Sequence, residues 1–323
     1  MKRLHRGVLL FAASMLCALG ASAQPYPNRP IKLIVADSAG GAPDQLGRLL
    51  AQKLSDGLGQ QVVVDNRAGA GGALGAEMAA KSAPDGYTLL LTTTAIYAIL
   101  PNLRKNLPYD PVKDFVPISR IATASNVLVV NNELPAKDIA ELIKLAKEKP
   151  GALNYASAGV GTPAHLAGEM LNLLADIKVV HVPYKGAAPA LADVIAGNAQ
   201  YIITSPLAAG AHMNGGRVRA LATTGTQRNP SLPDLATIAE TLPGYDITQT
   251  WGIVVPTGTP PEIVNKLSAE IVKVMNQPDV REKVLATGAT PVGDSPAQFE
   301  AFMTKERQRL GDVIAKRGIV LTD

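Results

Sequence analysis

Residues 31–44 read IKLIVADSAGGAPD, an apolar run of strand length followed by a turn that contains Gly40 and Gly41. Leucines then recur at helical spacing from Leu46 to Leu54, so the stretch predicts a strand, a glycine turn and a helix. A helix start of this kind leaves backbone N–H groups unpaired and carries partial positive charge. The turn is therefore a candidate anion site at the junction of a strand and a helix.

A second turn of the same kind lies more than a hundred residues later. Residues 153–163 read LNYASAGVGTP, where a strand-like segment gives way to Gly159 and Gly161 before another helical pattern begins. Two anion-receptive turns in one chain predict a clamp, in which one ligand is held from two sides.

Strand-length apolar runs alternate with segments of helical period along the whole chain. Helices are expected over residues 137–146, from Pro260 onward, and over residues 296–316. This alternation predicts an α/β fold, in which ligands bind at the carboxyl ends of the strands. The runs expected to form strands are residues 31–36, 62–65, 88–92, 179–182, 201–204, 220–223 and 252–255.

The first 23 residues have the parts of a secretory signal peptide in order. Residues 1–6 are basic, residues 7–20 are apolar, and Ala21-Ser22-Ala23 is a small-residue cleavage site, so the mature chain is expected to begin at Gln24. The alternative is a membrane anchor, but the apolar run is shorter than the ~20 residues that a spanning helix needs. Cys17 is expected to leave with the signal peptide.

Removal of the signal peptide changes the charge of the protein. The whole chain has 31 basic and 27 acidic residues, a formal net charge of +4. Three of the basic residues (Lys2, Arg3 and Arg6) lie in the signal peptide, so the mature chain is almost neutral. Its basic residues are scattered, which argues against a nucleic-acid partner. An exported chain without cysteine is expected in the bacterial periplasm.

Enzyme classes find little support in the mature sequence. Its histidines (His165, His181 and His212) lack the spacing of a metal site, and a nucleophile turn and a phosphate-binding loop are also missing. Residues 159–164 match a dinucleotide-binding fingerprint, which leaves an exported dinucleotide-dependent enzyme as a remote alternative. We therefore expect no catalytic residues, no metal and no cofactor.

Six motifs distributed along the chain resemble those of one protein family. They are YPNRPI (residues 26–31), DNRAGAGG (65–72), PDGY (84–87), LPYDP (107–111), HLAGE (165–169) and HVPYKG (181–186). In this order they resemble the Bug (TctC-like) solute-binding proteins of tripartite tricarboxylate transporters. The resemblance covers essentially the whole mature chain.

The resemblance implies a periplasmic binding protein of type II, with two α/β lobes joined by two crossing strands. Lobe 1 would comprise residues 25–123 and 248–323, and lobe 2 residues 124–247, with crossings near residues 121–130 and 247–255. Such a protein holds a small organic carboxylate, a di- or tricarboxylate, between its lobes. It would act as a monomer and deliver the ligand to membrane permease subunits. The alternative partner is a membrane sensor kinase.

The resemblance also implies which residues bind the ligand. Two loops would supply most contacts, and the walls would come from residues 92–95, 183–186 and 204–205. The expected ligand-binding residues are Ser38, Ala39, Gly40, Gly41, Ala42, Asp44, Thr93, Ser157, Ala158, Gly159, Gly161, Thr162, Tyr184 and Thr204.

At several of these positions the sequence departs from the family pattern. Asp37-Ser38-Ala39 stands where relatives often have Phe-Pro-Pro, and Val160 and Ala164 stand where Asn and Gln are common. Thr204-Ser205 replaces Asp-Asn, so an acid that could meet a ligand amine is missing. These changes predict a roomier pocket that admits an aromatic or longer carboxylate, and they make an amino-acid ligand less favoured.

Alternatives stay open for several residues. Asp44 can cap the first helix turn instead of contacting ligand, and His165 fits a structural role better than a ligand contact. Lys185 can line the cleft or lie on the surface. Trp251 can belong to the hinge core or stack on an aromatic acid. Residues 66–72 are expected to shape the rim of the cleft.

Overall fold

The computed structural model describes residues 26–229, 232–317 and 319. The expected signal peptide, with Cys17, lies outside the described residues. Within the described part of the chain, no helix is both long enough and apolar enough to cross a membrane.

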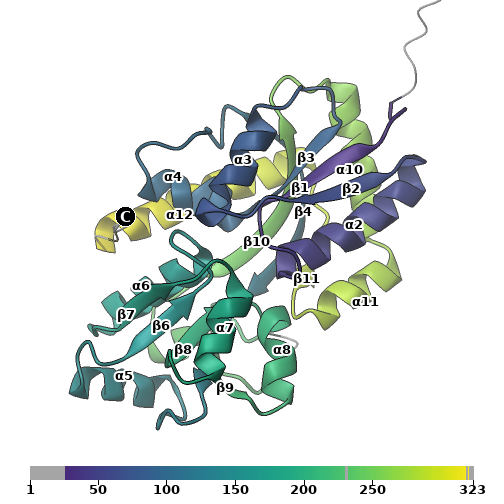
Figure 1. Ribbon diagram of the computed structural model, residues 1–323. Coiled ribbons are helices and arrows are strands. Elements are labelled where there is room, and N and C mark those ends of the chain that lie inside the picture. The colour runs from purple at the N-terminus through teal and green to yellow at the C-terminus, as the bar shows by residue number, and fades with distance from the viewer. Residues whose placement is uncertain (1–25, 230–231, 318, 320–323) are drawn as a thin grey trace, which may run out of the picture.

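Two separate sheets, each with its own helices, form two lobes that lie one beyond the other (Figure 1). The first lobe contains a six-stranded sheet in the order β11-β4-β10-β3-β1-β2. Its strands are β1 (Ile31–Val35), β2 (Val62–Asn66), β3 (Thr88–Thr93), β4 (Phe115–Ser125), β10 (Thr248–Pro256) and β11 (Thr290–Pro291). Its helical segments are α2 (Ala42–Leu58), η2 (Ala70–Gly72), α3 (Ala73–Ala80), η3 (Ala95–Ile99), α4 (Leu100–Leu103), α10 (Pro261–Met275), α11 (Pro278–Ala286) and α12 (Pro296–Arg317).

The second lobe contains a five-stranded sheet in the order β7-β6-β8-β5-β9. Its strands are β5 (Val127–Asn131), β6 (Asn154–Ser157), β7 (Val180–Pro183), β8 (Tyr201–Thr204) and β9 (Val218–Thr223). Its helices are α5 (Ile139–Glu148), α6 (Pro163–Leu174), α7 (Ala187–Ile195), α8 (Pro206–Asn214) and α9 (Ile238–Thr241). The two lobes confirm the α/β binding-protein fold that the sequence predicts.

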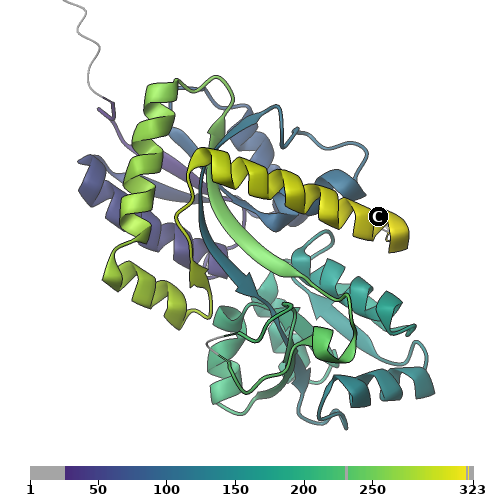
Figure 2. The same ribbon diagram turned by 180° about the vertical axis from the view of Figure 1, so that it is seen from behind.

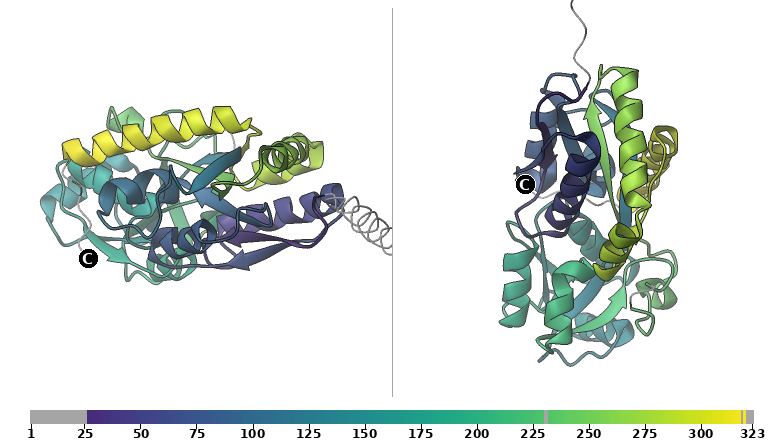
Figure 3. Two further views of the ribbon diagram at one scale, coloured as in Figure 1. Left: turned by 90° about the horizontal axis from the view of Figure 1, so that it is seen from above. Right: turned by 90° about the vertical axis from the view of Figure 1, so that its right-hand side faces the viewer.

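The buried strands of the first lobe pack helices on both faces of the sheet. Leu33 and Val35 of β1 belong to the core under α2 and α10, whereas Ile34 faces the core under α3 and α12. Successive strand residues point to opposite faces, so an uninterrupted apolar run is what a strand covered on both sides requires. Figure 2 shows α12 lying across β10, and Figure 3 shows the first lobe stacked on the second.

The chain passes between the lobes twice, and one hydroxyl joins the two passages. Asn126 lies between β4 of the first sheet and β5 of the second, and Ile247 directly precedes β10 on the return. The Thr224 hydroxyl accepts a hydrogen bond from Asn126 N–H (2.9 Å) and donates one to the carbonyl of Ile247 (2.5 Å). Both passages lie in the ranges expected for the crossings.

Candidate functional site

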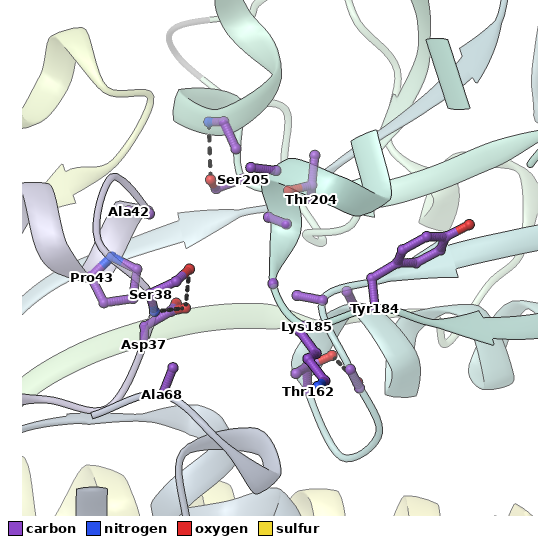
Figure 4. A pocket seen from close by; sticks show the side chains of 18 of the residues that line it. Asp37, Ser38, Ala42, Pro43, Ala68, Thr162, Tyr184, Lys185, Thr204 and Ser205 are labelled. Atoms are coloured by element: carbon purple, nitrogen blue, oxygen red, sulfur yellow. Dashed lines mark hydrogen bonds between the residues drawn. The ribbon is translucent and has the colours of Figure 1, made fainter. Parts of the chain in front are cut away.

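A cavity of about 1030 Å³ lies between the two sheets. The segments that follow β1, β3, β6, β7 and β8 all line it, so the carboxyl ends of strands from both lobes point toward one space. Figure 4 shows Asp37 and Ser38 of the first lobe on one side, with Thr162, Lys185 and Thr204 of the second lobe across from them. This is the place where α/β sheets bind ligands.

In the first loop, between β1 and α2, the protein's own carboxylates use part of the donor set. Ser38 N–H donates to Asp37 Oδ1 at 2.7 Å, and Gly40 N–H donates to Asp44 Oδ2 at 2.9 Å. Gly41 N–H donates to the carbonyl of Ser38 at 3.3 Å. The loop is therefore a weaker anion receptor than its sequence indicates.

Asp44 is turned into the protein and is not among the cavity-lining residues. Its side chain accepts hydrogen bonds from Arg48 Nε and Gly40 N–H at Oδ2 and from Asn66 Nδ2 at Oδ1, each at 2.9 Å. Burial alone would raise the pKa of Asp44, but these bonds and the Arg48 charge outweigh it and hold the pKa below its ordinary value. The geometry favours the helix-start role over ligand contact.

Asp37 does line the cavity, and it has no cationic partner among the described residues. Burial raises the pKa of this carboxyl above its ordinary value, and the hydrogen bonds from Ser38 offset only part of that rise. A carboxylate at this position repels an anionic ligand unless it takes up a proton.

In the second loop, between β6 and α6, neutral groups satisfy the equivalent donors. Ser157 Oγ accepts from Gly159 N–H at 3.1 Å, and His165 Nδ1 accepts from Gly161 N–H at 3.2 Å. Thr162 caps α6 by accepting from His165 N–H at 3.3 Å. The loop keeps its shape without adding negative charge to the site.

Two stacked histidines support this loop from beneath. The ring centroids of His165 and His181 are 4.1 Å apart, and Tyr155 stacks on His181 at 4.9 Å. Burial lowers the pKa of His165 to about 4, and burial together with the neighbouring His165 lowers that of His181 to about 3. Both rings are therefore neutral at pH 7, and His165 has the structural role that the sequence favours.

Backbone N–H groups that remain without a partner in the described chain gather at the starts of three helices. Glycine caps α2 and α7 at Gly41 and Gly186, and neither helix start has a side-chain cap. Such uncapped starts carry partial positive charge. The unpaired donors that line the cavity belong to Ala39, Ala42, Ala158, Val160, Ala164, Ala187 and Ala188.

Loops from the two lobes approach each other closely across the cavity. A Cβ atom added to Gly186 would lie 3.1 Å from Ser38 Oγ, and one added to Gly161 would lie 2.5 Å from Leu100 Cδ2. Both glycines also have positive φ (+118° and +79°), where other residues are strained. The close approach of the lobes thus depends on the absence of a side chain at these positions.

The structure brings eleven of the fourteen expected ligand-binding residues to the cavity wall. Ser157, Gly161 and Asp44 lie behind it, and they position the loops instead. Tyr184 lines the wall, but its hydroxyl bonds to the carboxylate of Asp193, which raises the pKa of Tyr184 to about 12. The residues on the wall are Ser38, Ala39, Gly40, Gly41, Ala42, Thr93, Ala158, Gly159, Thr162, Tyr184 and Thr204.

Further lining residues were not expected as contacts from the sequence. Asn126 and Gln249 come from the two crossing segments, and because polar residues precede both of them, their sequence context carries no distinct signal. The rim residues 68–72 and Lys185 also line the cavity, whereas Trp251 is 1% exposed and belongs to the core of the first lobe. Basic groups on the wall that the sequence left unassigned are Arg104, His212 and Arg217.

Known proteins share this fold and much of this sequence. Residues 46–319 match the family model of the tripartite tricarboxylate transporter family receptor, TctC. Protein BugT of Bordetella pertussis is 37% identical, and the alignment covers 99% of both chains. An R. palustris protein solved with adipate is 35% identical, with a TM-score of 0.88 over 91% of this chain and 99% of that one. MatC of Rhodopseudomonas palustris, solved with bound malate, is 31% identical, with a TM-score of 0.84 over 90% and 100% of the two chains.

Proposed function

The chain belongs to the tripartite tricarboxylate transporter receptor family, and we propose that it captures a small organic carboxylate between its lobes and delivers it to membrane permease subunits. The observation that carries this proposal is the set of backbone N–H groups without a partner in the described chain at the starts of α2, α6 and α7, on residues that all line one cavity. Backbone donors at helix starts bind an anion without a fixed side-chain charge, so the ligand can also be released.

The size and lining of the cavity support a ligand larger than a small amino dicarboxylate. Its volume of about 1030 Å³ is at the upper end of the range for small-molecule sites, ~300–1,000 Å³. Alanine and glycine form much of the wall, and Thr204 and Ser205 leave no acid opposite the loops. We expect longer aliphatic or aromatic carboxylates to bind, with adipate and malate as the reference ligands from the related structures.

We propose that the two lobes close around the ligand as rigid units. Lobe 1 would comprise residues 25–123 and 248–323, and lobe 2 residues 124–247; the division into two sheets supports this, although β4 of the first sheet extends to Ser125. Ligand that contacts both lobes shifts the equilibrium toward the closed form by its greater affinity for that form. The hinge would be the pair of crossing segments.

A binding role is also favoured over a catalytic one. Ser157 Oγ lies 2.7 Å from His181 Nε2, which is the spacing of a nucleophile and its base. The Ser157 side chain is completely buried, however, and the pKa of His181 is lowered to about 3 by burial. A nucleophile that substrate cannot reach, next to so weak a base, argues for a structural pair.

Equilibrium binding tests the proposal directly. Protein freed of endogenous ligand by unfolding and refolding is titrated calorimetrically with adipate, malate, citrate, benzoate, phthalate and aspartate. We expect carboxylates to bind and aspartate to bind weakly or not at all. Binding of aspartate alone would contradict the proposed ligand class, and an absence of binding to every carboxylate would contradict the function.

The partner and the compartment need a cellular experiment. We propose that the signal peptide (residues 1–23) is removed and that the mature protein acts in the periplasm as a monomer. In a deletion strain, uptake of the ligand identified by calorimetry should be lost. Intact uptake with lost ligand-induced transcription would favour a sensor kinase as the partner instead. Mass spectrometry of the periplasmic protein should give an N-terminus at Gln24.

A further inference from the structure

Four uncharged polar side chains line the cavity where the two sheets meet. Two of them are strand residues: Thr93 lies opposite Trp251 in the β3–β10 ladder, and Thr204 lies opposite Val127 in the β5–β8 ladder. Asn126 directly precedes Val127, and Gln249 is two residues before Trp251. The part of the cavity wall formed by Thr93, Asn126, Thr204 and Gln249 is therefore neutral and polar. The charged lining residues come from loops and helix ends: Asp37, Arg104, Lys185 and Arg217.

Asn126 has a fixed backbone and an unused side chain. Its N–H donates to Thr224 Oγ1 and its carbonyl accepts from Thr224 N–H, each at 2.9 Å. The residue is only 1% exposed, yet no other described residue bonds to its carboxamide, and Oδ1 is completely buried without a partner. Gln249 is half-buried, and its carboxamide also lacks a partner in the described chain.

An unpaired buried amide is costly, at about 1–3 kcal/mol. Asn131, at the end of β5, shows how a buried carboxamide is ordinarily satisfied. Its Nδ2 donates to the carbonyl of Val194 and its Oδ1 accepts from Glu133 N–H, both at 2.8 Å. Asn126 borders the cavity and its Nδ2 is not completely buried, so an occupant of the cavity can pair with Nδ2 directly and with Oδ1 once the carboxamide rotates toward the cavity. Buried polar groups left unpaired in this way are where a binding site achieves its selectivity.

We propose that the carboxamides of Asn126 and Gln249 form a subsite for a hydroxyl group of the ligand, so that this protein prefers hydroxycarboxylates to the same acids without the hydroxyl. The proposal rests on the carboxylate-binding function proposed above. A carboxamide presents one acceptor and one donor group, and a hydroxyl can pair with both. A carboxylate at neutral pH only accepts hydrogen bonds, so it would leave the amide oxygens unpaired.

Pairs of acids that differ by one hydroxyl provide the test. Malate with succinate, 2-hydroxyglutarate with glutarate, and mandelate with phenylacetate are titrated calorimetrically into ligand-free protein. In the pairs that bind, we expect the wild type to prefer the hydroxylated acid by about tenfold, the effect of one hydrogen bond of about 1.4 kcal/mol. A wild type without this preference in any pair overturns the subsite. An absence of binding to all six acids overturns the carboxylate-binding function itself.

Substitution assigns the preference to these residues. Leucine has a volume similar to that of asparagine. Asn126→Leu should weaken the binding of only the hydroxylated acid, so that the two acids of a pair bind with affinities within about twofold of each other. Gln249→Leu should lower the ratio of the same two affinities. Because Asn126→Leu breaks no internal side-chain hydrogen bond, its urea midpoint should equal or exceed that of the wild type. An unchanged ratio in Asn126→Leu overturns the proposal.

The matched control is Asn131→Leu, a second buried asparagine away from the cavity wall. Its loss of the bonds to Val194 and Glu133 should lower the urea midpoint while the hydroxyl preference stays as in the wild type. If Asn131→Leu reduces the preference as much as Asn126→Leu does, the effect comes from general disturbance of the fold, and the subsite is overturned.

Discussion

The two loops that face each other across the cavity have the same local design but differ in electrostatics, since the first contains carboxylates and the second is neutral. Each follows a parallel strand, turns through glycines of positive φ and begins a helix. The first, residues 36–44, satisfies internal N–H groups with the carboxylates of Asp37 and Asp44. The second, residues 157–165, uses the neutral Ser157 and His165 for the same purpose.

The difference shows that a glycine turn before a helix does not by itself determine how an anion is received. What matters is which acceptors the protein itself directs to the turn. In the second loop the internal acceptors are uncharged, so the unpaired donors at Ala158 and Val160 keep their full attraction for a carboxylate. In the first loop, Asp37 opposes that attraction.

The strongest test of the comparison replaces one glycine in each loop. Gly40 and Gly161 have nearly equal φ angles of +84° and +79°, so valine costs each about 1–2 kcal/mol of backbone strain. Only Gly161 has a close neighbour, because its added Cβ would lie 2.5 Å from Leu100 Cδ2 and Leu100 is completely buried. Gly161→Val should weaken carboxylate binding about thirtyfold and Gly40→Val about threefold, as measured by calorimetry. Equal losses would contradict the asymmetry.

The second test uses pH, because the neutral histidines should make the second loop sensitive to mild acid. A histidine whose pKa is lower in the folded than in the unfolded state stabilises the folded protein at neutral pH. This contribution is lost as the pH falls from the unfolded pKa, ~6.5, toward the folded pKa. For His165, with a folded pKa of about 4, the loss between pH 7 and pH 5 is about 2 kcal/mol. NMR titration should place the pKa of His165 near 4 and that of His181 near 3. A value near 6.5 for either ring would contradict the buried, neutral stack.

The amide of Gly161 gives a local measurement of the same event. Its proton is bonded to His165 Nδ1, so hydrogen exchange should be slow at pH 7 and should lose protection once the ring is protonated. Gly40 N–H, bonded to a carboxylate of lowered pKa, should keep its protection over this range. Parallel loss at both amides would mean that the loops do not differ.

The third test removes the negative charge of Asp44, which holds the first loop through hydrogen bonds to Gly40, Arg48 and Asn66. Asp44→Asn keeps an acceptor but weakens the hydrogen bonds to the buried carboxylate and loses the ion pair with the half-exposed Arg48, and we expect a loss of about 1.5 kcal/mol in the free energy of unfolding at pH 7. Because the pKa of Asp44 is lowered, its contribution is present above the unfolded pKa, ~3.9, and is lost as the pH falls through the folded pKa. Urea unfolding should therefore show a larger difference between the variant and the wild type at pH 7 than at pH 3.

A control for Asp44→Asn is available at another helix start. Asp138 caps α5, where its Oδ1 accepts from Glu141 N–H at 2.8 Å, and it is exposed. Asparagine is an equally good cap, so Asp138→Asn should change the stability by less than about 0.5 kcal/mol. A loss as large as that of Asp44→Asn would point to charge at helix starts in general rather than to the first loop.

The last tests concern the charges on the cavity wall, beginning with a gain of affinity at Asp37. Asp37→Asn removes a negative charge from the wall and keeps the acceptor for Ser38 N–H, so carboxylate affinity at pH 7 should rise about three- to tenfold. The pKa of Asp37 is raised, so the carboxyl favours folding below its unfolded pKa and loses that effect as the pH rises. The variant should thus also be slightly more stable at pH 7.

Lys185→Gln removes a positive charge from an exposed position on the cavity wall. It should lower carboxylate affinity by about twofold, as measured by calorimetry; a larger fall would make that lysine a principal contact.

Much of the fold could be predicted because its central strands, such as β1, β3 and β8, are largely buried on both faces. Each expected apolar run overlaps a strand, as with residues 201–204 and β8, and the expected helix over residues 137–146 corresponds to α5. The long β4 strand is missing from the expected apolar runs, since Pro117, Ser119 and Arg120 interrupt its apolar pattern, and only its end lies in an expected crossing. Its strand conformation comes from the ladder with β10, a contact between segments more than a hundred residues apart.

The site was predictable to the extent that it depends on glycine and backbone. Gly40 and Gly159 have positive φ and line the cavity, and the need for glycine at such turns leaves a sequence signal. The direction of the Asp44 side chain left no sequence signal, since an acid in the first turn of a helix can face the ligand or the protein equally well. Asn126 was overlooked for a related reason: its importance lies in the lack of an internal partner, and only the packed structure reveals that.

The hydroxyl of Thr224 has a mechanical consequence. Because it bonds to Asn126 in one crossing and to Ile247 in the other, neither segment can twist without displacing its neighbour. In the lobe closure proposed above, the two connections would therefore bend about a common axis, and sideways sliding of the lobes would be suppressed. Closure would then follow a single path that brings Gly186 to Ser38, the contact present in this structure.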